Sequence, residues 1–305
     1  MTNITIRQLR YFDSLARHGH FGHAAEACAV SQPALSVQIR ELEETLGSTL
    51  FERMPRRVRL TTLGREFLKR TQEILRAVDE LGDLARAAKG QWIGQLRIGV
   101  IPTIAPYLLP TIVERLNQSF AGVDIRVRET MTSTLIKELT EGRIDTAILA
   151  LPISEPSLTE VPLFDENFVL IRPDADRNKP VPDRDMLQEM QLLLLEEGHC
   201  FRDQALSFCN IQPNQPRETL DGSSLSTLVQ MVGAGLGVTL VPEMAIPVET
   251  GAAAVSVARF SEPQPSRTVG MLWRKTSPLA HQYHRIAEIV RNADEARRTS
   301  FKAAI

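Results

Sequence analysis

The amino-acid sequence predicts an α/β protein with an all-α-rich winged helix-turn-helix head, a long linker helix and a two-lobed regulatory body. Three observations lead to this fold class: two short helices joined by a tight turn, a proline-free stretch with heptad spacing, and alternating strand and helix patterns from Gly94 onward. The length of 305 residues suggests about two domains. A hydrophobic fraction of 43% and a charged fraction of 24% are typical of a globular chain and exclude a disordered one.

Residues 1–61 are predicted to form the winged helix-turn-helix. Apolar residues at helical spacing predict helices within residues 4–18 and 21–28. A third helix is expected to begin at Ser31, a good N-cap, and to end at Gly47, a typical C-terminal residue. Two apolar runs that flank a Pro-Arg-Arg tip then predict a two-stranded hairpin, the wing.

The second helix of such a motif presents its N-terminal side chains to base edges in the major groove. Glutamine can bond adenine, arginine can bond guanine or phosphate, and arginines on a wing hold phosphates. The residues expected to contact DNA are Gln32, Pro33, Ser36 and Arg40 on the helix and Arg53, Arg56 and Arg57 on the wing. The alternative is a solvated helical hairpin with a basic turn. Residues 1–90 carry 14 Lys and Arg against 11 Asp and Glu, a weak excess that permits a polyanionic partner.

Residues 62–90 are predicted to form a linker and dimerisation helix. Apolar or small side chains recur there at steps of four and three: Phe67, Thr71, Ile74, Val78, Leu81, Ala85 and Ala88. One helix cannot bury such a seam alone, so we expect a homodimer through this helix. Roughly 28 residues at about 1.5 Å each would make a rod of about 42 Å.

Residues 91–305 are predicted to form the regulatory body. Runs of β-branched residues predict strands at residues 96–101, 124–129, 146–151, 168–173 and 238–242, with helices such as 108–120 and 134–141 between them. This alternation favours largely parallel sheets with binding at the carboxyl ends of the strands. We expect one lobe from residues 91–165 plus 269–305 and another from residues 166–268, because about 210 residues exceed one compact lobe.

Cys200 and Cys209 are the most informative residues of the body. Helical spacing of the apolar residues between them predicts a helix over residues 200–211. Nine residues of helix separate two α-carbons by about 13.5 Å, whereas a disulfide needs roughly 4.4–6.8 Å. A disulfide between these cysteines therefore requires the helix to unravel. Cys200 follows His199 at the expected helix N-terminus, where the dipole favours an anion.

The segment RQLRYFDSLARHGHFGHAAEACAVSQPALSVQIRELEETLGSTLFERMPRRVRLTTLG resembles the winged head of LysR-type transcriptional regulators. That family has a long linker helix and a two-lobed body similar to periplasmic binding proteins, and these match the predicted elements. The segments IPTIAPYLLP, EVPLFDE, EEGHCFRDQALSFC and GAGLGVTLVPEMAIP resemble the family's peroxide-sensing members. The resemblance runs nearly end to end, with drift at residues 174–188, at 210–220 and in the tail.

The resemblance implies a DNA-binding regulator that senses hydrogen peroxide. Cys200 would be oxidised to a sulfenic acid and would then form a disulfide with Cys209. The resemblance places the peroxide site at Thr103, Thr132, His199, Cys200, Asp203 and Arg267. Such donors are needed because full ionisation of an ordinary thiol accelerates its reaction only about tenfold at pH 7.4. From the residues alone, the two threonines could instead cap helices, and Cys209 could be an apolar core residue.

The resemblance also implies partners: promoter DNA, RNA polymerase, a thiol reductant such as glutaredoxin or thioredoxin, and a second dimer to complete a tetramer. We expect no cofactor and no metal, because the histidines at positions 18, 20 and 23 lack cysteines at zinc-ligand spacing. We also expect no membrane span and no secretory signal, and hence a cytoplasmic protein. Two alternatives stay open: a LysR-type regulator that binds a small-molecule co-inducer and has non-reactive cysteines, and a thiol peroxidase. A peroxidase needs no DNA-binding head, so we expect a protein that is not an enzyme.

Overall fold

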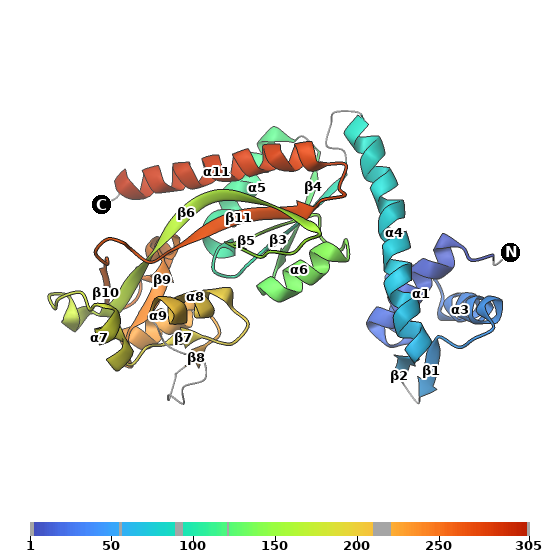
Figure 1. Cartoon of the computed structure of the whole chain (residues 1–305), viewed down its shortest axis with the longest axis horizontal. Helices are drawn as coiled ribbons and strands as arrows, with labels where there is room; N and C mark the ends of the chain where they lie inside the picture. Colours follow the sequence, from blue (N-terminus) through green and yellow to red (C-terminus); the bar gives the residue numbers. More distant parts are fainter. Residues whose placement is uncertain (1–2, 55–56, 89–93, 121, 210–220, 304–305) are drawn as a thin grey trace. The chain divides into compact units, whose positions relative to one another are not determined.

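The computed structural model describes residues 3–54, 57–88, 94–120, 122–209 and 221–303. The chain divides into two compact units, Met1–Ala85 and Arg86–Ile305 (Figure 1). The first unit holds the predicted head and most of the linker helix, and the second holds the regulatory body.

The head contains three helices: α1 (Ile6–His18), α2 (Phe21–Ala27) and α3 (Gln32–Leu46). Ser31 caps α3 as predicted, since its hydroxyl accepts a hydrogen bond from the Ala34 N–H at 3.4 Å. Gly47 ends α3 in the left-handed conformation, with φ of 64°. One hydrophobic core joins the three helices and includes Phe12, Leu35, Ile39 and Leu42.

The wing consists of β1 (Phe51–Met54) and β2 (Arg57–Leu60), which pair antiparallel. Linker helix α4 (Thr62–Ala88) has 27 residues, or about 40 Å of rise. The first residues of the predicted dimer seam pack within the head instead. The Phe67 ring meets the Phe12 ring edge-on, with 5.2 Å between centroids, and Thr71 is buried. The start of the seam is therefore covered by the head itself and needs no second chain, because α4 folds back on α1 within one unit.

The regulatory unit is built on a seven-stranded sheet. Its strands are β3 (Gln95–Val100), β4 (Asp124–Glu129), β5 (Thr146–Leu151), β6 (Leu158–Pro173), β9 (Thr239–Pro242), β10 (Val255–Ala258) and β11 (Ser266–Arg274). They lie in the order β10-β6-β11-β5-β3-β4, with β9 also paired to β6. Only the β3–β4 and β3–β5 pairs of this sheet are parallel.

The prediction of largely parallel sheets is therefore wrong. β11 pairs antiparallel with both β5 and β6, and β6 pairs antiparallel with β9 and β10. The side chains of a buried strand report its burial but not its direction. Parallel pairs occur where a helix makes the crossover, as α5 (Ala105–Ser119) does between β3 and β4 and α6 (Thr132–Thr140) does before β5.

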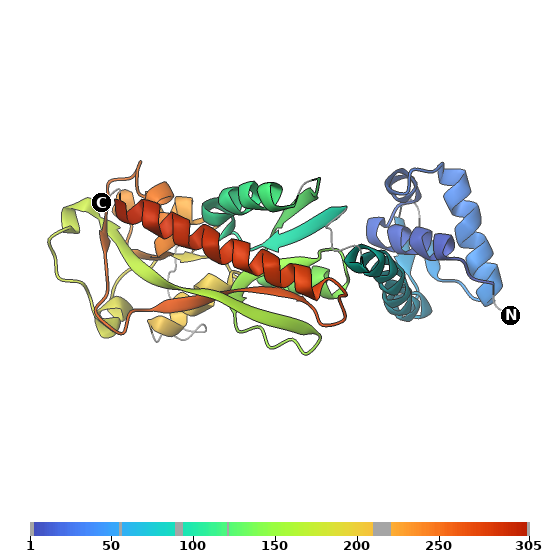
Figure 2. The same cartoon turned by 90° about the horizontal axis from the view of Figure 1, so that it is seen from above.

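Helices cover both faces of this sheet. α5 packs beside the C-terminal helix α11 (Ala280–Ala303) on one face, and α6 lies on the other (Figures 1 and 2). The remaining elements lie between β6 and β10 in the chain: η1 (Asp174–Asp176), α7 (Arg184–Glu189), β7 (Leu194–Leu195), α8 (Cys200–Phe208), β8 (Asp221–Gly222), α9 (Leu225–Gly233), η2 (Glu243–Ala245) and α10 (Ile246–Glu249).

Two separate hydrophobic cores fill the regulatory unit. The first packs β3, β5 and β11 against α5, α6 and α11, with Trp273 and Tyr283 among its largest buried side chains. The second packs the end of β6 against α8, α9 and β9, around Phe168 and Phe201. Strand β6 is continuous between them, and α8 lies where the two cores meet, because it contributes residues to both.

Candidate functional site

Helix α8 carries both cysteines that the sequence singled out. Cys200 is its first residue and Cys209 is its C-cap, whose N–H donates to the Ala205 carbonyl at 3.0 Å. The predicted start is confirmed, but α8 ends at Phe208 rather than at residue 211, and residues 210–220 lie outside the described part of the chain. Both cysteines are thiols, with no disulfide between them.

The two thiols contact different cores. Cys200 is half-buried and packs against the first core, whereas Cys209 is fully buried in the second. Phe201, which follows Cys200, holds α8 on the second core through an edge-on contact with Phe168, with 4.9 Å between ring centroids. Nine residues of helix separate the two α-carbons by about 13.5 Å, too far for a disulfide, so the sulfurs cannot join while α8 is intact.

The turn into α8 depends on one glycine. Gly198 has φ of +96°, a conformation that favours glycine, and a Cβ there would lie 2.7 Å from the Met131 sulfur. Met131 in turn lies just before α6, beside Thr132. This contact brings the start of α8 against the segment between β4 and α6.

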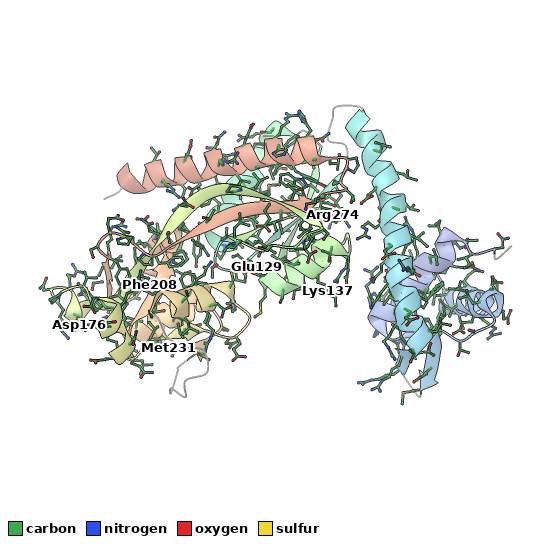
Figure 3. All side chains as sticks on the ribbon, viewed as in Figure 1. Glu129, Lys137, Asp176, Phe208, Met231 and Arg274 are labelled. Atoms are coloured by element: carbon green, nitrogen blue, oxygen red, sulfur yellow. The ribbon has the colours of Figure 1, made fainter. Side chains whose placement is uncertain are left out.

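A cavity of about 340 Å³ lies beside that turn. It is lined by Pro102, Thr103, Pro106, Tyr107, Glu129, Thr130, Met131, Leu195, His199, Ser223, Ser224, Leu225, Ser226 and Glu249. Figure 3 labels Glu129 at the end of β4. Among the described residues, Thr103 and His199 are the predicted site residues that line the cavity, whereas Thr132, Cys200, Asp203 and Arg267 do not.

Thr103 and Arg267 are held together by a buried hydrogen-bond network. The Arg267 guanidinium donates to the Thr103 hydroxyl at 2.8 Å and to the Thr103 carbonyl at 2.9 Å. It also forms an ion pair with Glu166, in which N and O lie 2.8 Å apart. Arg267 is thus a buried, ion-paired residue.

Neither predicted threonine caps a helix. The N-cap residues of α5 and α6 are Ile104 and Met131, and neither makes a side-chain cap bond. The Thr132 hydroxyl oxygen is buried without a hydrogen-bond partner among the described atoms, so it can bond a ligand. Asp203 lies exposed in the first turn of α8. The helix dipole stabilises a negative charge at this end of the helix.

His199 is buried, and desolvation lowers the pKa of its imidazole below the ordinary value despite the opposing effect of Glu196. The lowered pKa favours the neutral imidazole over the imidazolium. A neutral imidazole still offers one N–H donor to a cavity ligand.

Sequence reasoning missed a second polar cluster in the cavity wall. The Tyr107 hydroxyl donates to Glu249 Oε1 at 2.6 Å, and the Ser226 hydroxyl donates to Glu249 Oε2 at 2.6 Å. Burial and the neighbouring carboxylate raise the pKa of Tyr107 far above its ordinary value. Tyr107 lies within the segment IPTIAPYLLP, but the sequence gave no sign of its partner 142 residues away.

The predicted DNA-contacting residues of α3 lie on its outer face. Gln32, Pro33 and Arg40 are exposed and Ser36 is half-buried, opposite a buried apolar stripe. Arg57 is exposed on the wing. The side chain of Arg53 and the whole of Arg56 lie outside the described part of the structure.

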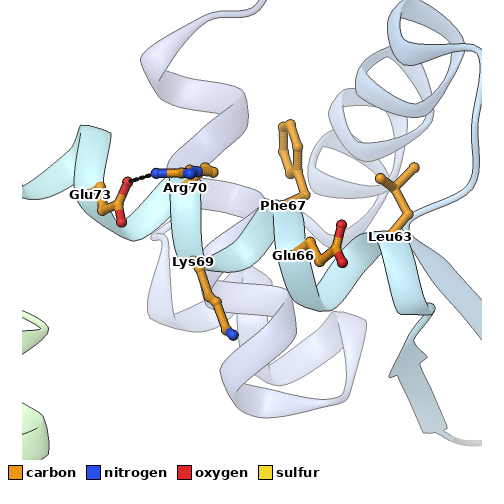
Figure 4. A pocket seen from close by; sticks show the side chains of 6 residues that line it. All are labelled: Leu63, Glu66, Phe67, Lys69, Arg70 and Glu73. Carbon is orange, nitrogen blue, oxygen red and sulfur yellow. Dashed lines mark hydrogen bonds and ion pairs between the residues drawn. The ribbon is translucent and has the colours of Figure 1, made fainter.

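Both before and after Thr71, α4 presents exposed apolar side chains within its own unit. Leu63, Ile74, Leu81 and Leu84 are 44–66% exposed. An open groove of about 480 Å³ runs along the first half of this helix (Figure 4). It is lined by Leu63, Glu66, Phe67, Lys69, Arg70 and Glu73, with Arg70 paired to Glu73 at 2.9 Å.

The described residues offer neither a metal site nor a membrane span. They contain no cluster of three or more His, Cys, Asp or Glu side chains that could hold a metal ion. The His20 and His23 rings do stack, with 4.8 Å between centroids, but His20 Nδ1 accepts from the Gly22 N–H and caps α2. Nor is any described helix both long and apolar enough to cross a membrane.

Two protein-family models match this chain. Residues 6–65 match the model "Bacterial regulatory helix-turn-helix protein, lysR family", and residues 89–295 match the "LysR substrate binding domain". A "Probable hydrogen peroxide-inducible genes activator" of Streptomyces viridosporus is 42% identical over 95% of this chain and 94% of its own. The "DNA-binding transcriptional dual regulator OxyR" of Escherichia coli K12 is 41% identical over 94% of this chain and 95% of its own.

Solved structures of OxyR proteins are also similar to this chain. A full-length OxyR variant from Pseudomonas aeruginosa has a TM-score of 0.78 and 38% identity, covering 95% of both chains. A peroxide-bound OxyR mutant from Corynebacterium glutamicum has a TM-score of 0.67 and 34% identity, covering 96% of this chain and 93% of its own. The resemblance predicted from the sequence is confirmed: the protein belongs to the LysR family of bacterial helix-turn-helix transcriptional regulators.

Proposed function

We propose that this protein is a hydrogen-peroxide-responsive regulator that binds promoter DNA. Relatives named for peroxide induction align with 94–95% of the chain. One observation carries the proposal: a single helix begins at a half-buried thiol, next in sequence to the cavity residue His199, and ends at a second, buried thiol. Bonding the two sulfurs requires that helix to unravel, which turns oxidation into a change of shape.

The proposed site surrounds Cys200 with groups that bind a peroxide oxygen. Thr103, Thr132 and His199 supply hydrogen-bond donors, and Arg267 and Asp203 position them. The unpartnered Thr132 hydroxyl supports this assignment, because a buried hydroxyl without a bond is costly unless a ligand completes it.

Two steps follow. The Cys200 sulfur attacks one peroxide oxygen, the O–O bond breaks, and the other oxygen leaves as hydroxide, which takes a proton to become water. The Cys209 sulfur then attacks the Cys200 sulfenic sulfur, and the hydroxyl group leaves as water with the Cys209 proton. The thiols lose two electrons, and one peroxide becomes two water molecules. A thiol reductant such as glutaredoxin or thioredoxin restores both thiols.

The regulator would act on DNA as an assembly. Pairing of the exposed α4 faces of two chains brings two heads to one promoter, and two dimers form a tetramer. Oxidation repacks the regulatory unit, changes the spacing of the heads and alters contacts with promoter DNA and RNA polymerase. Because promoter DNA is the partner, the protein acts in the cytoplasm. Identical DNA footprints of the reduced and oxidised protein would contradict this step.

Mass spectrometry of the full chain after brief peroxide treatment tests the cysteine chemistry. We expect a peptide crosslink between Cys200 and Cys209 that dithiothreitol reverses. If both thiols stay unmodified at peroxide concentrations that induce the target genes, the sensing proposal is wrong.

One observation favours a second candidate, a regulator whose cavity binds a small-molecule co-inducer while the cysteines stay inert. The cavity of about 340 Å³ is far larger than a peroxide needs, and Cys200 does not line it. A promoter assay in cells separates the candidates. Peroxide induction is lost in Cys200→Ser and kept in the control Cys28→Ser if the cysteine is the sensor, whereas a co-inducer mechanism leaves the two variants alike.

A further inference from the structure

Glu166 holds the Arg267 side chain from the neighbouring strand. The two residues lie directly opposite each other on β6 and β11, with side chains 1% and 0% exposed. Arg267 Nε and Nη2 donate to Glu166 Oε2 at 2.9 and 2.8 Å. Glu166 Oε1 accepts from the Met244 N–H at 2.9 Å, so the carboxylate is fixed at both oxygens.

This arrangement determines the direction in which the Thr103 hydroxyl can donate its hydrogen bond. Its oxygen accepts a hydrogen bond from Arg267 Nη1, and the Thr103 carbonyl accepts from Nη2. A hydroxyl that accepts from a guanidinium must donate its own proton elsewhere, because a guanidinium has no acceptor. None of the described residues accepts that proton, and Thr103 lines the cavity beside His199. Its proton is therefore available to a cavity ligand.

We propose that Glu166 is a positioning residue for the reaction of Cys200 with peroxide: it fixes Arg267 so that the Thr103 hydroxyl donates to a bound peroxide oxygen. This inference rests on the proposed function. The guanidinium contacts Glu166 and Thr103 and does not line the cavity, so it acts through Thr103. Donors fixed in advance stabilise developing charge without reorganisation, and loss of one typically slows a reaction by roughly 100-fold or more.

The test compares two rate constants at Cys200 in the full-length protein, each followed by quenched-flow mass spectrometry: oxidation by hydrogen peroxide and alkylation by iodoacetamide. Glu166→Gln removes the charge that orients Arg267. We expect its peroxide rate constant to fall by roughly 10- to 100-fold while its alkylation rate constant stays within about twofold of wild type. Iodoacetamide requires an accessible thiol but no donor to a peroxide oxygen.

The matched control is Asp145→Asn. Asp145 is also a buried carboxylate, and it pairs at 2.6 Å with Arg97, whose side chain is 32% exposed, so this variant measures the general cost of breaking an ion pair. We expect it to lower the melting temperature and to leave both rate constants unchanged. Glu166→Asp keeps the charge and should retain part of the peroxide rate; it also carries the test if Glu166→Gln does not fold.

Three outcomes would overturn the inference. Peroxide rates equal to wild type in both Glu166 variants exclude a positioning role while the proposed function stands. An equal fall of the peroxide and alkylation rate constants assigns Glu166 to the fold alone. A wild-type Cys200 that peroxide does not oxidise refutes the proposed function, and this inference with it.

Discussion

Cys200 and Cys209 begin and cap the same helix yet pack against two different hydrophobic cores. Cys200 lies half-buried at the edge of the first core, and Cys209 is enclosed by the second. On the proposed cycle, the reacting thiol is the accessible one and the resolving thiol is protected until α8 opens. This order of events predicts different outcomes for the two cysteines when each is changed.

Replacing Cys209 should stop the cycle halfway. In Cys209→Ala, Cys200 still reacts with peroxide, but no second thiol can displace the sulfenic hydroxyl. We expect a Cys200 adduct with dimedone, detected by mass spectrometry, and no crosslink. The small cavity left in the second core should cost roughly 1 kcal/mol of stability. A variant that forms neither sulfenic acid nor adduct would show that Cys209 is needed for the first step.

The exposed apolar face of α4 should hold the dimer together. Leu81 is 66% exposed, and a carboxylate at this position would have to be buried unpaired in a helix–helix seam. We expect Leu81→Glu to weaken dimerisation at least tenfold and Leu81→Met, which conserves volume, to leave it unchanged. Sedimentation equilibrium of the full chain gives the two dissociation constants. A Leu81→Glu dimer as tight as wild type would place the interface elsewhere.

Acid should destabilise the regulatory unit through His199. Burial lowers the pKa of this imidazole in the folded chain, so the unfolded chain binds the proton more readily. The stability that this group contributes is complete above its unfolded pKa of about 6.5 and is lost as the pH falls toward the folded pKa. Urea midpoints of the full chain at pH 7.5, 6.5 and 5.5 should fall more steeply for wild type than for His199→Asn. Parallel curves would mean that His199 is not the titrating group.

Two variants of the head should distinguish contacts to bases from contacts to phosphates. Gln32 begins α3 and Arg57 lies on the wing, and both are exposed. Gln32→Ala should cost about 1–3 kcal/mol on the cognate promoter and little on random DNA. Arg57→Ala should weaken both equally and reduce the salt dependence by about one phosphate contact. Fluorescence anisotropy with both DNAs between 50 and 200 mM salt distinguishes these effects.

Local features of this fold could be predicted from the sequence, and long-range pairings could not. Strands β4 and β5 have the predicted bounds, and Ser31 and Gly47 limit α3 as expected, because caps and apolar spacing act over a few residues. Strand direction and the partner of Arg267 depend on contacts far apart in the chain. Glu166 lies 101 residues before Arg267, and only the β6–β11 register places them opposite each other.

The candidate site shows the same division. The helix that carries Cys200 and Cys209 could be predicted from spacing, but the lowered pKa of His199 could not, because it follows from burial by residues outside its own segment. Similarly, the hydrogen bond between Tyr107 and Glu249 joins residues 142 positions apart, which local spacing does not reveal.

The enclosed position of Cys209 has a consequence for how a response would end. Drawing this side chain out of the second core leaves a vacancy among apolar neighbours, so the crosslinked form gives up packing that the dithiol form possesses. Once a reductant cleaves the crosslink, refilling that vacancy favours recovery without any further input. The duration of the signal would then depend on the supply of reductant, and the protein itself would return unaided to its resting shape.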